Sequence, residues 1–192
     1  MVLAFFDFVP VLAFYVGTRY LIRWARLFDR RDISTGMMVG SILAVIGGAT
    51  KAIWKLLVTM DLGDVVWLGE AQFALLAPGF FLMFVSALGV LFQENKTIRA
   101  GLGAMALWKI PLLAFMTLSS LGLYGVLGFL GWRKKNYLVP VLYAITVICT
   151  IGLAGMATQA QNITQQWLEE GVNAIGQIAF VGGSYRMCKD YE

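Results

Sequence analysis

Long apolar runs constrain this chain more than any other feature of its sequence. Six can be recognised, at residues 2–22, 35–58, 65–92, 103–131, 138–157 and 167–187. About twenty residues of α-helix cross the hydrocarbon core of a bilayer. Lipid offers the backbone no hydrogen bonds, so a spanning segment is a helix or part of a closed barrel, whose strands are shorter and alternating. The sequence therefore predicts an all-α integral membrane protein with six transmembrane helices.

The composition agrees with this prediction and leaves no room for a separate soluble domain. Of the 192 residues, 59% are hydrophobic and 14% are charged, and the mean hydropathy is +0.76. A soluble domain is closer to half apolar and a quarter charged. We expect a multi-pass protein of the cell membrane whose main partner is the lipid bilayer, either as a homo-oligomer or beside other membrane subunits.

Several classes of function are excluded by missing residues and motifs. There is no histidine, which removes His-based acid–base chemistry and His-based metal or haem sites. Cys149 and Cys188 do not form a metal-binding or redox motif. No nucleotide-binding, hydrolase or protease signature is present. The net charge of +4 forms no basic face, so nucleic acid is not expected. We therefore expect no enzyme, no cofactor and no metal site.

Two stretches recur about one hundred positions apart, which predicts an internal repeat. Residues 7–14 match residues 108–115 at four of eight positions, including a proline. Residues 67–80 match residues 167–180 at five of fourteen positions, including a tryptophan and a glutamate. Two matches in the same order at nearly one offset favour a duplication, which is worth seeking before other features.

The repeat divides the chain into a first three-helix unit at residues 1–94, a polar linker at 95–102 and a second three-helix unit at 103–192. Because three is odd, two directly joined copies would cross the membrane in opposite directions. The sequence thus predicts two inverted-topology repeats, an arrangement found in many transporters, with binding sites between the halves.

Basic residues do not decide the orientation under this topology. Seven lie on the side of the first, third and fifth loops: five at 19–31, then Lys96 and Arg99. Seven lie on the other side: Lys51, Lys55, three at 133–135, Arg186 and Lys189. The positive-inside rule is therefore tied, and the dominance of the first helix favours both termini outside.

Glu70 and Glu170 are the leading candidates for a functional pair. They occupy matching positions in the repeat, each within a turn of a predicted helix start and beside a tryptophan. One interpretation is an interfacial anchor, since the helix dipole stabilises an anion there by roughly 0.3–1 kcal/mol. The other is a pair of carboxylates that bind a cation or exchange a proton along a pathway, because ionisable residues in membrane helices are often functional.

Further polar residues accompany these carboxylates. Asn173 and Gln177 lie on the same helical face as Glu170, either as interhelical hydrogen-bonding groups or as the lining of a polar cavity. Lys51 and Lys55 lie one turn apart near a helix end. They can reach the interface with their ammonium groups or, if Glu70 folds back, form an ion pair with it.

Small residues mark a helix-packing surface on the second predicted span. Gly36, Gly40, Ala44 and Gly48 recur every four residues, and this spacing lets two helices approach closely. Two functions follow from these patterns. The first is a transporter or channel for an ion or small polar solute. The alternative is a non-catalytic subunit that anchors or scaffolds a larger membrane complex, with the small-residue face as its docking surface.

Overall fold

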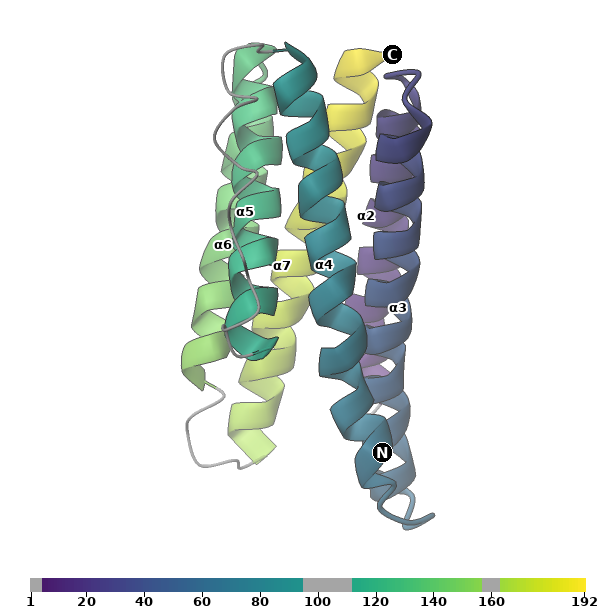
Figure 1. Cartoon of the computed structure of the whole chain (residues 1–192). Helices are drawn as coiled ribbons and strands as arrows, with labels where there is room; N and C mark the ends of the chain where they lie inside the picture. The colour runs from purple at the N-terminus through teal and green to yellow at the C-terminus, as the bar shows by residue number, and fades with distance from the viewer. Residues whose placement is uncertain (1–4, 95–111, 157–162) are drawn as a thin grey trace.

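The computed structural model describes residues 5–94, 112–156 and 163–192, and in these ranges the chain is helical without strands. Its helices form one elongated bundle, in which α5 and α6 are visibly shorter than α3 and α4 (Figure 1). In chain order they are α2 (Phe8–Arg26), α3 (Arg31–Thr59), α4 (Val66–Glu94), α5 (Leu112–Arg133), α6 (Leu138–Met156) and α7 (Ile163–Tyr191).

Four of these helices are long and apolar enough to cross a membrane, namely α3, α4, α5 and α6. The sequence predicts six spans. The two other helices are less apolar, since α2 carries Arg19, Arg23 and Arg26 and α7 carries several carboxylates and amides. The observed helices begin and end within a few residues of the predicted runs, except that α5 starts at Leu112 and residues 103–111 lie outside the described part.

The helices form a closed ring around a common interior. Within each group of three, neighbours in sequence pack together, α2 on α3 and α3 on α4, then α5 on α6 and α6 on α7. Two further contacts close the ring, α4 on α5 and α2 on α7. Residues from both halves of the chain therefore face the same interior space.

Both contacts between the two groups join helices that run in the same direction. Phe14 packs on Phe180 and Trp24 on Tyr191, so α2 and α7 are parallel. Along α4 and α5, Phe81 contacts Phe115 and Phe84 approaches Gly122, so these helices are parallel as well. The groups α2–α4 and α5–α7 thus run in the same sense.

This arrangement differs from the predicted inverted relation of the two units. The prediction assumed that a short linker joins two antiparallel helices at one end of the bundle. In the structure α4 ends at the end of the bundle where α5 also ends (Figure 1). The predicted linker, residues 95–102, falls within 95–111, outside the described residues. The described chain also begins and finishes at opposite ends of the bundle, whereas the sequence favoured both termini on one side.

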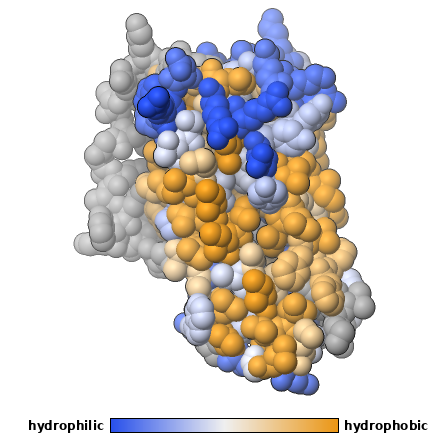
Figure 2. All heavy atoms as spheres, turned by 90° about the vertical axis from the view of Figure 1, so that its right-hand side faces the viewer, coloured by the Kyte–Doolittle hydropathy of each residue, from blue (hydrophilic) through white to orange (hydrophobic). Residues whose placement is uncertain are grey.

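The two ends of the bundle differ in charge and are named accordingly. At the basic end, Arg23 pairs with Glu192, Asn136 donates to Asp190, and Lys134 stacks on Tyr191. At the opposite end, here the cluster end, α2 begins and a turn joins α3 to α4. Between the ends, many large apolar side chains are exposed, and Figure 2 shows them as a broad hydrophobic belt below the basic end. Exposed apolar surface of this extent marks a membrane or protein contact, and together with the four long apolar helices it favours a membrane protein.

The small-residue face of α3 is buried against α4 of the same chain. A Cβ on Gly40 would lie 2.6 Å from the Gly79 carbonyl oxygen, and one on Gly36 would clash with Ser86 Oγ. Ala44 packs on Gly79, while Gly48 faces Val11 of α2. In a membrane, lipid is as apolar as the helix surfaces, so apolar burial does not drive helices together. Small residues instead let the two backbones come close enough to pack tightly. Gly36, Gly40 and Ala44 are therefore already covered and do not present an outward docking surface.

Candidate functional site

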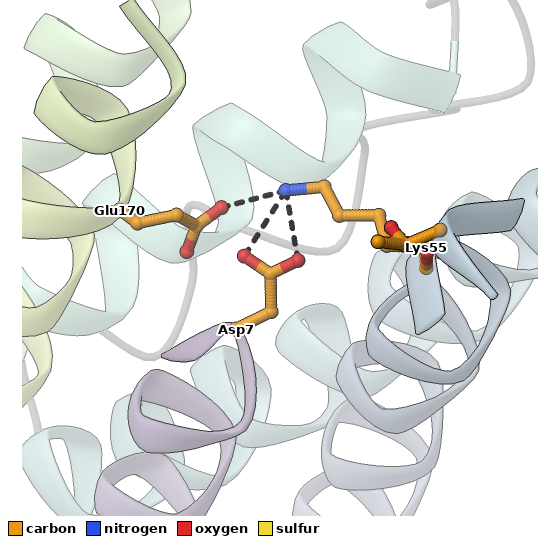
Figure 3. Close-up of polar contacts among 4 residues, drawn as sticks. Asp7, Lys55 and Glu170 are labelled. Atoms are coloured by element: carbon orange, nitrogen blue, oxygen red, sulfur yellow. Dashed lines mark hydrogen bonds and ion pairs between the residues drawn. The ribbon is translucent and has the colours of Figure 1, made fainter. Parts of the chain in front are cut away.

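Three charged side chains from different helices meet at the cluster end, and we call them the charged cluster. Lys55 Nζ lies 2.7 Å from Glu170 Oε1 and donates a hydrogen bond to it. The same ammonium donates to Asp7 Oδ1 at 3.2 Å and lies 3.1 Å from Asp7 Oδ2. Figure 3 shows the lysine reaching from α3 between the two carboxylates. One cation is therefore shared by two anions.

The helix directions explain why residues so distant in sequence meet. Asp7 is the residue that precedes α2, where the partial positive charge of the helix N-terminus stabilises a carboxylate. The parallel packing of α2 on α7 brings Asp7 beside the early turns of α7, which carry Glu170. Antiparallel packing of α3 on α2 brings Lys55, near the end of α3, to the same level.

The charged cluster is largely removed from solvent. Asp7 and Glu170 are each 6% exposed, and the Lys55 side chain is 27% exposed. Removing an ion from water costs several kcal/mol after relaxation, and ion pairing repays this only with good geometry and further hydrogen bonds. Two carboxylates facing one ammonium carry one excess negative charge. Lys51, one turn before Lys55, lines the same cavity and supplies a second positive charge close to both carboxylates.

The charged cluster forms part of the wall of a central cavity of about 310 Å³. Every helix of the ring contributes to this wall. Its polar residues are Asp7, Lys51, Lys55, Gln72, Thr117, Thr150, Glu170, Asn173 and Gln177. The volume lies at the lower end of the range typical for small-molecule sites. The cavity thus combines both signs of charge with neutral hydrogen-bonding groups in a space suited to a small solute.

Aromatic rings close the inner end of the cavity, and we call them the aromatic plug. Phe14 and Phe80 line the cavity and pack on each other with ring centroids 5.6 Å apart. Behind them Phe180 stacks on Phe14 at 5.1 Å and meets Tyr124 at 5.8 Å. Tyr143 completes the plug through contacts with both Tyr124 and Phe180. Phe180, Tyr124 and Tyr143 are buried, so packed aromatic side chains separate the cavity from the basic end.

The structure brings together most of the polar residues singled out in the sequence. Lys51, Lys55, Glu170, Asn173 and Gln177 all line the central cavity. The sequence suggested an ion pair of Lys51 and Lys55 with Glu70. In the structure, Lys55 instead pairs with Glu170 and Asp7. The helical face that carries Glu170, Asn173 and Gln177 therefore forms part of the cavity wall.

Glu70 does not lie in the cavity. It is exposed near the start of α4. The cavity-facing residues of α4 are Gln72, Leu76 and Phe80, spaced four apart. Two residues of α-helix correspond to a rotation of about 200°, so Glu70 points away from the face that Gln72 presents. The two glutamates that match in sequence therefore occupy different environments.

Four polar lining residues, Asp7, Gln72, Thr117 and Thr150, were not among the predicted pathway residues. Asp7 lies close to the start of the first predicted span, at residues 2–22. Its signal was its position within an apolar run, three residues before Pro10, where a carboxylate is expensive unless paired. Gln72 stands alone among apolar residues and carries no periodic signal in the sequence.

Two acceptors in the cavity wall have unused hydrogen-bonding capacity. Within the described residues, Gln177 Oε1 is buried and accepts no hydrogen bond, and Asp7 Oδ2 accepts none despite its proximity to Lys55. Buried acceptors are normally satisfied, so Gln177 Oε1 is available to a donor on a bound molecule, whereas Asp7 Oδ2 lies 3.1 Å from the Lys55 ammonium. Across the same ranges, no group of three or more His, Cys, Asp and Glu side chains is placed to hold a metal ion.

The fold and cavity define a class by themselves: an all-helical bundle, with four helices apolar enough to span a membrane, around a central polar cavity. Comparison with protein families, curated proteins and solved structures found no match to this chain. The geometry of the cavity therefore carries the functional argument.

Proposed function

We propose that this protein is a membrane transporter for a small polar solute, and that the solute binds in the central cavity against the charged cluster. The observation that carries this proposal is the position of Asp7, Lys55 and Glu170 in the wall of a cavity to which all the ring helices contribute. In membrane helices, paired ionisable residues that face an internal cavity mark substrate or ion pathways.

The chemistry of the wall favours a solute that carries both signs of charge. Lys51 and Lys55 provide cations, Asp7 and Glu170 provide anions, and Asn173 with Gln177 can donate and accept hydrogen bonds. A zwitterion such as an amino acid or a betaine can neutralise both groups at once. Such a ligand would also offset the cost of keeping the charged cluster away from water.

This proposal requires α2 and α7 to cross the membrane together with the four more apolar helices. Their lower hydropathy is consistent with a lipid-facing position, because some polar residues point inward: Thr18, Glu170 and Ser184 are buried. Their outward faces are apolar, for example Leu12, which is 61% exposed, and Ile178, which is 62% exposed. Both helices also belong to the ring of the bundle, α2 packed on α3 and α7 packed on α6.

The same proposal places the cavity on the outer side of the membrane. The basic end carries ten of the described Lys and Arg residues: Arg19, Arg23, Arg26, Arg30, Arg31, Arg133, Lys134, Lys135, Arg186 and Lys189. The cluster end carries Lys51 and Lys55, which line the cavity. The tie in the sequence count arose from the assumed topology. With the observed helix directions, the positive-inside rule puts the basic end in the cytoplasm.

A carrier fits this arrangement better than an open channel. The cavity lies toward the cluster end, and the aromatic plug separates it from the basic end. A solute entering from outside would stop at Phe14 and Phe80 until the plug rearranged. This corresponds to one state of an alternating-access cycle, with the solute bound between the halves of the chain.

Uptake into proteoliposomes tests the proposal. The purified protein is reconstituted and supplied with a radiolabelled mixture of amino acids, with protein-free liposomes as background. We expect uptake by the wild type, and a loss of at least tenfold in Glu170→Gln, which removes one anion of the charged cluster. Glu70→Gln is the matched control, because Glu70 is exposed outside the cavity, and should transport normally.

Thermal unfolding of each variant in detergent separates lost transport from lost folding. Wild-type uptake in a folded Glu170→Gln variant would rule out a role for this carboxylate in transport. Background uptake by the wild type would rule out amino acids as the substrate class.

A further inference from the structure

A second concavity lies between α2 and α3 near the basic end, and Val45 of α3 lines both it and the central cavity. This second concavity measures about 790 Å³, and residues of these two helices and the first residue after α2 line it. Its lining includes Arg19, Arg23 and Arg26 of α2 and Ile42, Val45 and Ile46 of α3. We call this concavity the arginine groove.

The groove is basic along one helix and apolar along the other. Arg19, Arg23 and Arg26 are spaced four and three residues apart, which places them on one face of α2. Across from them, Ile42 and Ile46 of α3 are 50% and 47% exposed. In Figure 2, which faces this side of the molecule, hydrophilic residues gather at the basic end directly above the hydrophobic belt.

Of the three arginines, one is paired with a carboxylate within the described residues. Arg23 forms an ion pair with Glu192. Among the described residues, Arg19 forms no ion pair and donates a hydrogen bond to the neutral Tyr15 hydroxyl at 3.5 Å. Arg26 forms no ion pair with any described carboxylate. Two guanidinium groups thus remain available to an anion, and guanidinium binds phosphate oxygens in a bidentate manner.

We propose that the arginine groove binds an anionic phospholipid, with the phosphate held by Arg19 and Arg26 and an acyl chain lying along Ile42 and Ile46. The charge complementarity and the adjoining apolar wall match the two parts of such a lipid. Basic pockets between transmembrane helices on the cytoplasmic side are known to hold anionic headgroups. The basic end is the cytoplasmic end in the orientation proposed above, so the groove would face the corresponding leaflet.

Native mass spectrometry of the purified protein tests this site. The protein is mixed with equal amounts of dioleoyl phosphatidylglycerol and dioleoyl phosphatidylcholine, and the retained lipid is counted as collision energy rises. We expect one phosphatidylglycerol to be retained in preference to phosphatidylcholine. In an Arg19→Gln, Arg26→Gln double variant, the affinity for phosphatidylglycerol should fall about tenfold. Equal retention of the two lipids by the wild type would overturn the proposal.

Two controls separate a lipid site from general attraction to anions. An Arg31→Gln, Arg186→Gln double variant removes the same charge at the basic end but outside the groove, and should bind as the wild type does. An equal loss in this control would overturn the assignment. Inorganic phosphate in excess should not displace the lipid, and displacement would mean an anion site without lipid specificity. Ile46→Trp, which fills the apolar part without changing charge, should also weaken binding, and unchanged binding would count against the acyl-chain position.

Discussion

At the residue scale, Lys55 holds the charged cluster together, because it is the ammonium shown between two buried carboxylates. Its removal would leave Asp7 and Glu170 without the ammonium that contacts both, and Lys51 would be the remaining cation of the cavity wall. Removing one partner from a buried ion pair is far more destabilising than replacing the whole group by neutral residues. The charged cluster is therefore expected to tolerate complete neutralisation better than the loss of its cation.

Lys55→Met should lower the free energy of unfolding by about 3–5 kcal/mol. Thermal unfolding in detergent measures this as a reduced Tm. The triple variant Asp7→Asn, Lys55→Met, Glu170→Gln should recover most of that stability while remaining inactive in transport. Lys189→Met, at an exposed position near the end of α7, is the control and should unfold as the wild type does. A Lys55→Met variant as stable as the wild type would show that the cluster contributes no net stability.

Glu70 and Glu170 occupy matching positions in the internal repeat but lie in different environments in the structure. Periodicity identified Glu170, Asn173 and Gln177 as one face of a helix, and that face lines the cavity. It did not identify which face of α4 turns inward, because α4 is apolar nearly all round. Rotation of an apolar helix about its axis is decided by packing against its neighbours, which no single helix reveals.

At the element scale, the contact between α3 and α4 depends on small side chains. Gly40 and Gly79 allow the two backbones to approach so closely that a Cβ at either position would lie under 3.0 Å from backbone atoms of the other helix. The sequence predicted this packing surface from its four-residue spacing. The partner of the surface could not be predicted, because the spacing is equally suited to a second protein and to a neighbouring helix of the same chain.

Gly40→Ala should therefore destabilise the bundle by about 1–3 kcal/mol, the usual cost of overpacking an interior contact. The Tm in detergent is again the measurement. Gly125→Ala on α5 is a matched control, since nothing lies within 4 Å of a Cβ built there. If both variants shift the Tm equally, close packing of α3 on α4 is not what stabilises this contact.

At the scale of the whole molecule, the directions of the helices decide which parts of the chain share a side of the membrane. In an inverted six-span topology, the loop at residue 61 and the loop at residue 135 lie on the same side. In the structure these loops lie at opposite ends of the bundle, since α3 and α5 run in opposite directions. The two topologies therefore make opposite predictions about labelling.

Cysteine labelling distinguishes them. In a background with Cys149→Ala and Cys188→Ala, single Asp61→Cys and Lys135→Cys variants are treated in intact cells with a membrane-impermeant maleimide. We expect the first to react from outside and the second to react only after the membrane is permeabilised. Reaction of both from the same side would contradict the parallel arrangement of the two groups.

The sequence by itself determined that this chain forms long helices and where most of them begin and end. Its spacing of polar residues also placed Glu170, Asn173 and Gln177 on one face of α7. These properties are local, because each depends on a run of about twenty residues or on the period of a single helix. Only the tertiary structure decided that the two groups run in the same sense, that Asp7 completes the charged cluster and that Glu70 stays outside. Each of these depends on contacts between helices far apart in sequence, whose relative direction and rotation are set by how their side chains pack.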